Sequence, residues 1–164
     1  QKILGIPIEI VNIDIDEIQS MDLKKIVKHK TLEAYRRIKK PLFVDDVSFE
    51  VKVWNGFPGP FIKFLRLAGS DLLIRMLSGE KDKSVKVVAG IGYHDGKKIH
   101  YVEGSFTGEI VPRRGNKGWG FDPYVIPRGF RKTLGEMGEG FKNKVSHRAR
   151  ALRKLKKLLD SQKT

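Results

Sequence analysis

The sequence predicts an α/β domain in which helices pack against a mixed β-sheet. Three observations lead to this prediction. An amphipathic helical pattern is followed directly by a long apolar strand pattern, two further strand patterns are separated by a short turn, and a second amphipathic helical pattern closes the chain. The 164 residues suffice for one domain with a core of ordinary size, and no internal repeat or linker divides them.

The first half of the chain contains four of the expected elements. Residues 6–15 alternate apolar and polar positions, which predicts a half-buried strand. Residues 22–39 carry apolar side chains at helical spacing among Lys and Arg, which predicts an amphipathic helix. A strand is expected over 41–53, followed by turn residues at 55–60 and a second helix over 61–77.

The second half continues with a hairpin and ends in a helix. Residues 84–93 and 97–110 are expected to form two strands around the turn His94-Asp95-Gly96. Residues 111–143 are rich in Gly, Pro, Arg and Lys, and such a long irregular stretch inside a domain is usually functional. Residues 145–159 place apolar side chains on one face of a basic helix.

The composition limits the classes of partner. Lys and Arg total 33 against 19 Asp and Glu, a net charge of +14, which predicts attraction to nucleic acid, an anionic membrane or a phosphorylated small molecule. The absence of cysteine excludes disulfides and thiolate metal sites and fits a cytosolic setting. No apolar stretch approaches the roughly 20 residues of a membrane span. We therefore expect a cytoplasmic protein with no membrane partner.

Two adjacent carboxylates interrupt the strand pattern LFVDDVSFEV at residues 42–51. Burying one unpaired charge costs several kcal/mol, so Asp45 and Asp46 both need partners if the strand is buried. Neighbours in a strand point to opposite faces. At most one of the two acids therefore serves a given site, and the other requires a separate partner. The alternative is that the strand ends here and both acids are solvated.

Aromatic and basic residues gather in two later motifs. In GWGFDP at 118–123, an exposed Trp119 or Phe121 would stack on a flat ring, worth about 1–3 kcal/mol per base in nucleic-acid complexes. Alternatively, one or both of these aromatic side chains belong to the core. The choice between stacking and core packing stays open at this point.

The motif KNKVSHR at 142–148 lies where the last helix is expected to begin. Ser146 is a suitable N-cap, which places His147 and Arg148 in the first turn, where the helix dipole disfavours cations. A local rule broken in this way is typical of a functional site. With Lys142 nearby, this helix start suits an anionic or oxo-bearing ligand.

These motifs resemble those of the inosine triphosphate pyrophosphatase family, which cleaves non-standard purine nucleoside triphosphates such as ITP, dITP and XTP. The resemblance spans nearly the whole chain and is carried by five motifs in order: Asp16-Glu17-Ile18-Gln19-Ser20, Asp45-Asp46, Asn55-Gly56-Phe57-Pro58-Gly59-Pro60-Phe61-Ile62-Lys63, Gly120-Phe121-Asp122-Pro123 and Lys142-Asn143-Lys144-Val145-Ser146-His147-Arg148. It implies an elongated mixed sheet in two lobes flanked by helices, with the nucleotide in the cleft between the lobes. It also implies release of pyrophosphate, a requirement for Mg²⁺ and a homodimer.

The resemblance further implies roles for single residues. Glu17 matches the metal-binding glutamate, and Asp46 matches the metal ligand and base, whereas Asp45 is expected to be a support residue. Lys30 and Lys63 match basic positions that contact the nucleotide. The residues implied to hold the base and its surroundings are Trp119, Gly120, Phe121, Asp122, Lys142, His147 and Arg148. Because a guanidinium only donates hydrogen bonds, Arg148 suits the C6 oxygen of hypoxanthine and xanthine and leaves the amine of adenine unpaired.

Two departures from the family pattern stand out. Val47 occupies a substrate-binding position that usually carries Ser or Thr, so a backbone N–H or Ser48 would have to take over that contact. The family also opens with a strand and a Ser/Thr-x-Asn-x-x-Lys phosphate loop that have no counterpart here. We therefore expect that the domain, residues 1–164, lacks this first strand and loop as printed.

Two other functions are considered beside the pyrophosphatase. The stretch 141–164 has nine Lys or Arg against one Asp, which fits a nucleic-acid-binding module, although a solvated helix face is favoured and no known nucleic-acid motif is present. The change at Val47 also fits a nucleotide-binding protein without hydrolytic activity. A Mg²⁺-dependent pyrophosphate-release assay on a nucleotide panel separates the three.

Overall fold

The computed structural model describes residues 2–118 and 120–162 and confirms the α/β class. Within this part, one sheet has the strand order β2-β1-β3-β4-β5, and all its pairings are antiparallel. The strands are β1 (Leu42–Val51), β2 (Pro58–Gly59), β3 (Ser84–His94), β4 (Ile99–Ile110) and β5 (Val125–Pro127). The helices are α1 (Leu23–Ile38), α2 (Ile62–Leu67), α3 (Ser70–Met76), α4 (Glu139–Val145) and α5 (His147–Ser161), with short 3-10 turns η1 (Lys52–Trp54) and η2 (Asp122–Tyr124).

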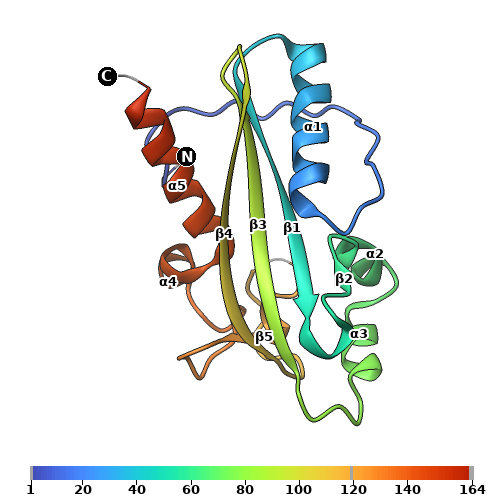
Figure 1. The fold of residues 1–164 in the computed structure, drawn as a ribbon. Helices are drawn as coiled ribbons and strands as arrows, with labels where there is room; N and C mark the ends of the chain where they lie inside the picture. The colour runs from blue at the N-terminus through green and yellow to red at the C-terminus, as the bar shows by residue number, and fades with distance from the viewer. Residues whose placement is uncertain (1, 119, 163–164) are drawn as a thin grey trace.

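Helix α1 covers one face of the sheet, beside β1 and β3 (Figure 1). It begins at the N-cap Asp22, whose carboxylate accepts hydrogen bonds from the next backbone N–H groups, and it ends where Lys39 turns left-handed. Its buried residue Val27 packs against Val88 of β3. A side chain at Gly92 of β3 would collide with α1, so the glycine permits the close approach. The helix predicted over 22–39 is confirmed.

Helix α5 covers the opposite face, beside β3 and β4 (Figure 1). Ala89 and Ile91 of β3 point to this face and pack against Ala151 and Leu155 of α5. Gly104 of β4 lies directly under the helix, where a Cβ atom would collide with the α5 backbone. The helix start is therefore fixed against the sheet by close backbone contact as well as by apolar burial.

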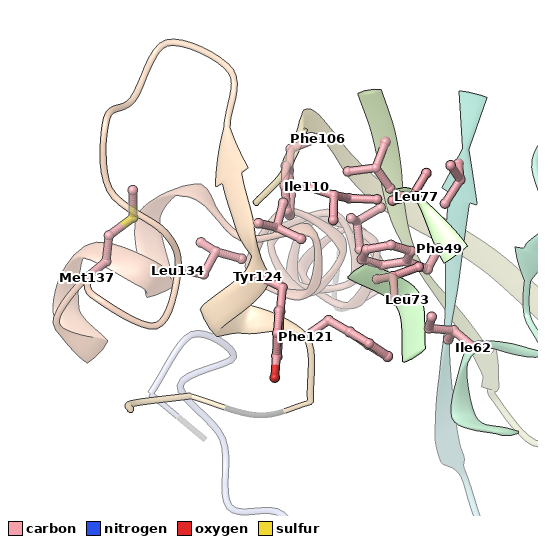
Figure 2. Close-up of a cluster of buried hydrophobic side chains, with 14 residues drawn as sticks. Phe49, Ile62, Leu73, Leu77, Phe106, Ile110, Phe121, Tyr124, Leu134 and Met137 are labelled. Carbon is pink, nitrogen blue, oxygen red and sulfur yellow. The ribbon is translucent and has the colours of Figure 1, made fainter. Parts of the chain in front are cut away.

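A second core lies at the other end of the sheet, under α2, α3 and β5. Figure 2 shows this cluster, in which side chains from the long strands meet those of the irregular segment 111–138. Its labelled members are Phe49, Ile62, Leu73, Leu77, Phe106, Ile110, Phe121, Tyr124, Leu134 and Met137. The hairpin of β3 and β4 runs through both cores and joins them into one body.

The strand predicted over residues 6–15 is wrong. This segment is an extended connection that crosses the molecule between α5 and α1 (Figure 1), and Ile10 is 90% exposed. Alternation of apolar and polar residues predicts a strand only if a neighbouring strand supplies hydrogen bonds. Among the described strands, none forms a ladder with this segment. The single helix expected over 61–77 is instead two helices, α2 and α3, which are separated at Gly69 with its positive φ of 115°.

No helix in the described part of the chain combines the length and apolar character needed to cross a membrane. The longest, α1, carries charged side chains along its exposed side.

Candidate active site

Strand β1 separates the two adjacent acids, as predicted. Asp46 lies opposite Gly90 in the sheet register and shares the face covered by α1, whereas Asp45 lies opposite Ile91 and shares the face covered by α5. The short strand β2 pairs only further along β1, so in the described sheet β1 is an edge strand at both acids. Neither acid is left solvated without a partner, because each has a cation on its own side.

On the α1 face, two lysines form ion pairs with the carboxylates of Glu17 and Asp46. The ammonium of Lys30, on α1, lies 2.8 Å from Glu17 Oε1 and 3.0 Å from Asp46 Oδ2. Lys63, on α2, forms a second ion pair with Glu17. The other oxygen of Asp46 accepts the backbone N–H of Val47 at 2.8 Å. Glu17 and Asp46, predicted as metal ligands, are thus brought to one cation, although they are far apart in the sequence.

The charges of this cluster alter its ionisation. Partial burial by itself raises the pKa of Glu17, but the hydrogen bonds and charges of Lys30 and Lys63 together outweigh it and lower the pKa below its ordinary value. Burial also lowers the pKa of Lys30, but its contacts with Glu17 and Asp46 outweigh this and raise the pKa. Both pKa shifts favour the charged forms of Glu17 and Lys30.

On the α5 face, the partner of Asp45 is Arg148. Its Nε lies 2.6 Å from Asp45 Oδ2, and the two residues are separated by 103 positions in the sequence. Ser146 caps α5, as predicted, because its hydroxyl accepts the N–H of Ala149 at 3.2 Å. The cap fixes the first turn of α5 and with it the backbone of Arg148.

The remaining predicted residues meet around His147. Asp122 is 7% exposed and is ion-paired with Lys142. His147 has a buried Nδ1 that, in the described structure, has no hydrogen-bond partner. Burial, assisted by the charges of Arg148 and Lys142, lowers the pKa of His147 to about 3. The imidazole is therefore neutral near pH 7.

One cavity of about 870 Å³ connects these groups. The predicted site residues that line it are Asp46, Val47, Lys63, Gly120, Phe121, Asp122, Lys142, His147 and Arg148. Glu17 and Lys30 are not among the described lining residues, but both contact residues that line it. Trp119, predicted to stack on a base, lies outside the described residues.

Two basic residues of the cavity were not predicted. Arg66 lies one helical turn after Lys63 on α2, and Lys117 precedes the GWGFDP motif. The spacing Lys-x-x-Arg places both side chains of α2 on one helix face, and this signal was present in the sequence. With these two, cations outnumber carboxylates along the described cavity wall.

The structure also shows the partners of Val47, Ser48 and Phe121. The N–H of Val47 is bonded to Asp46, and the hydroxyl of Ser48 donates to Glu50 at 3.1 Å, so both groups already have partners. The Val47 side chain packs against the cores and contributes apolar surface to the cavity. Phe121 is a core aromatic, 5.3 Å from the ring of Phe49, and only part of it reaches the cavity.

The donor set fits a hard divalent cation with few protein ligands. Among the described residues, no group of three or more His, Cys, Asp or Glu could hold a metal ion. Mg²⁺ usually takes one or two carboxylates, together with waters and substrate phosphates. Glu17 and Asp46 meet this need, because their oxygens already converge on the single ammonium of Lys30.

The fold and the cavity define a class of α/β protein in which an antiparallel sheet, covered by helices on both faces, carries a basic ligand cavity. The chain belongs to the Ham1 family, whose model matches residues 1–158. It is 39% identical to the inosine triphosphate pyrophosphatase of Schizosaccharomyces pombe, over 99% of this chain and 89% of that protein. It is 40% identical to the dITP/XTP pyrophosphatase of Saccharolobus solfataricus, over 88% of this chain and 77% of that protein.

Solved structures support the same fold. The Ham1 protein of Staphylococcus aureus matches with a TM-score of 0.83 and 24% identity, over 92% of this chain and 82% of that one. A HAM1 protein from Coxiella burnetii matches with a TM-score of 0.81 and 25% identity, over 90% and 81% of the two chains. The family resemblance expected from the five sequence motifs is confirmed.

Proposed function

We propose that the protein hydrolyses non-standard purine nucleoside triphosphates, namely ITP, dITP and XTP, to the monophosphate and pyrophosphate. One observation carries this proposal: a single cavity joins Asp46, held in a lysine–carboxylate cluster, to a basic wall and to the group Asp122, Lys142, His147 and Arg148. The names of the relatives support the same substrates. Removal of these nucleotides from the cellular pool is the resulting role.

The phosphates belong at the α2 side of the cavity. Lys63, Arg66 and Lys117 line it, and a chain of phosphates carries several negative charges that these side chains neutralise. Lys30 lies just behind Asp46 and adds a further cation. Arg66 would bind phosphate oxygens in a bidentate manner, whereas the lysines act as point charges.

Mg²⁺ would be held by Glu17 and Asp46, and it is proposed as the cofactor. When bound, it would neutralise phosphate charge and lower the pKa of coordinated water. Lys30 and Lys63 form ion pairs with these two carboxylates and would add positive charge beside the phosphates.

Asp46 is proposed as the general base. Its Oδ1 is fixed by the N–H of Val47, and its Oδ2 is directed to Lys30. This carboxylate would accept a proton from the water that attacks the phosphorus, and the pyrophosphate would leave.

The base would be read at the other end of the cavity. Arg148 would donate to the C6 oxygen of hypoxanthine or xanthine, and adenine, which carries an amine there, would leave a donor facing a donor. His147 is neutral and presents a buried ring nitrogen. Asp122 would fix Lys142 beside it through their ion pair.

A nucleotide-binding protein without hydrolysis is the second candidate. It is favoured by Val47, which cannot donate a hydrogen bond from its side chain, and by the prior engagement of Ser48. The test is pyrophosphate release from ITP, XTP, dITP, GTP and ATP with and without Mg²⁺. Release from ITP that needs Mg²⁺ supports the pyrophosphatase, whereas tight ITP binding without release supports the second candidate.

A nucleic-acid-binding role would rest on the basic face of α5. Several of these cations are already used within the protein, since Arg150 donates to Ser105 O and Arg153 to two carbonyls at the end of α4. This use supports a structural role for the helix face. A steep fall of polynucleotide affinity with salt, without ITP turnover, would instead favour nucleic acid.

A homodimer and a cytoplasmic location are part of the proposal. Apolar side chains are exposed on α2, where Phe64 is 55% and Leu67 76% exposed, and at the end of α3, where Met76 is 42% exposed. Such a patch suits a partner subunit. Light scattering of the purified protein tests the dimer, and Leu67→Glu should then shift it to the monomer. An unchanged dimer mass in that variant would place the interface elsewhere.

A further inference from the structure

The Asp45 carboxylate is the one acid of the β1 pair that does not reach the cavity. Asp46 lines the cavity, whereas Asp45 is not among its described lining residues. Asp45 instead binds Arg148, which does line it, through the Nε atom at 2.6 Å. We propose that Asp45 is the positioning residue that aims the Arg148 guanidinium at the purine base and thereby sets base specificity. This inference rests on the proposed role of Arg148 in reading the base.

The atoms in this contact determine what Arg148 has left for a ligand. A guanidinium has five N–H donors in one plane, one on Nε and four on the two Nη atoms. Asp45 takes the Nε donor, and no contact of the described residues to Arg148 Nη is recorded in the structure. The guanidinium is therefore held through Nε, and Arg148 also lines the cavity, where its Nη donors would meet a ligand. A lysine in the same place would have no such second set of donors.

The contact also supplies the order that a specific contact needs. The Arg148 side chain is 53% exposed, so without a partner it would sample many rotamers. Binding a base would then require that freedom to be lost at the moment of binding. The ion pair with Asp45 already restricts Arg148 in the free protein and so reduces the conformational entropy lost on binding. Only ligands that bind the Nη donors of Arg148 gain from this restriction.

Electrostatics give Asp45 a second reason to be an acid. Arg148 lies in the first turn of α5, where the helix dipole disfavours a cation, and Lys142 adds positive charge nearby. The Asp45 carboxylate opposes both effects. Among the described ion pairs, it is the only carboxylate within reach of Arg148.

The same ion pair could have served only to hold α5 on the sheet. The apolar contacts argue against this, because Ala151 and Leu155 are fully buried against Ala89 and Ile91 and dock the helix without Asp45. Ser146 fixes the helix start independently. Loss of the carboxylate should therefore free the Arg148 side chain while the helix stays in place.

The test compares wild type with Asp45→Ala and Asp45→Glu. The control is Glu50→Gln, which removes a carboxylate of the same strand whose partner is Lys86 and not Arg148. Binding of inosine and adenosine monophosphates is measured by calorimetry, and kcat/KM is measured for ITP and ATP. We expect Asp45→Ala to lower the inosine-to-adenosine ratio about 3- to 10-fold, the effect of ordering one long side chain. Asp45→Glu should restore part of the ratio, and Glu50→Gln should leave it unchanged.

A double variant separates positioning from a general effect on the fold. In an Arg148→Ala background, Asp45→Ala should change the ratio no further, because nothing remains to be positioned. A ratio that Asp45→Ala leaves unchanged, or that falls equally with and without Arg148, would overturn the inference. If wild type releases no pyrophosphate, the proposed hydrolysis fails, while the two monophosphate affinities still decide the role of Asp45. Equal affinities in wild type would overturn it as well.

Discussion

Replacing Asp46 by Asn tests the centre of the proposed mechanism with a minimal change of shape. The amide oxygen can still accept the N–H of Val47, which lies 2.8 Å from Oδ1. The amide nitrogen would face the Lys30 ammonium, now 3.0 Å from Oδ2, and two donors would then oppose each other. We expect Lys30 to move fully to Glu17, with which it already has a 2.8 Å contact.

The substitution should have two separate effects. Loss of a general base lowers kcat by about 10²–10⁴-fold, because an amide cannot take the proton of the attacking water. Stability should change far less. A hydrogen bond to a charged group contributes about 1.5–3 kcal/mol, but Lys30 keeps its second partner and the Asp46 side chain is 23% exposed, so a loss of about 1 kcal/mol is expected.

The assay is steady-state pyrophosphate release at saturating ITP, combined with inosine monophosphate affinity and thermal unfolding. Glu50→Gln is the matched control, since it removes a carboxylate on the same face of β1 whose partner Lys86 lies 3.6 Å away. Near-wild-type kcat in Asp46→Asn would refute the base assignment. A kcat loss accompanied by unfolding would show instead that the ion pair with Lys30 is mainly structural.

Three further predictions test other parts of the site. Arg148→Lys should lower the kcat/KM preference for ITP over ATP more than phosphate affinity; equal losses for both would mean that Arg148 reads phosphate. His147→Gln should flatten the dependence of unfolding free energy on pH at acid pH. The pKa of His147 is about 3 in the folded protein and near 6.5 in the unfolded chain, so wild type loses about 1.4 kcal/mol of stability per pH unit as the pH falls between these values. An unchanged slope in the variant would contradict this prediction. Gly104→Ala should destabilise the protein by about 3 kcal/mol in chemical denaturation, because the new Cβ collides with the α5 backbone. The control is Gly140→Ala, whose Cβ would have open space, and equal effects of the two substitutions would contradict the packing argument.

The sequence predicted those elements that form through interactions between residues close together in the chain. Helix α1 and the hairpin of β3 and β4 were found within one or two residues, because helical spacing and turn residues act locally. The segment 6–15 has an equally clear strand pattern, yet it forms none in the described structure. A strand depends on a neighbour, and no local pattern reveals whether that neighbour is present.

In the candidate site, too, local features were predicted from the sequence, whereas contacts between distant residues were not. The period of two in a strand predicted that Asp45 and Asp46 need separate partners, and this is confirmed. Their partners could not be predicted from spacing, because Arg148 lies 103 positions from Asp45 and meets it only through the docking of α5. Arg66 was missed for a different reason, since its helical spacing from Lys63 was present but pointed equally well to a solvated face.

Because side chains of β1 alternate between the two faces of the sheet, this strand supplies one acid to the proposed phosphate site and one to the proposed base site. Asp46 turns to α1 and to the phosphate-side lysines, whereas Asp45 turns to α5 and to the arginine proposed to read the base. A shift of one residue in the pairing of β1 with β3 would exchange the two acids and leave each facing the wrong cation. The buried Phe49, Val51 and Val87 resist that shift, because it would turn apolar side chains out of the core. Apolar packing at one end of the strand thus secures the placement of both charges at the other.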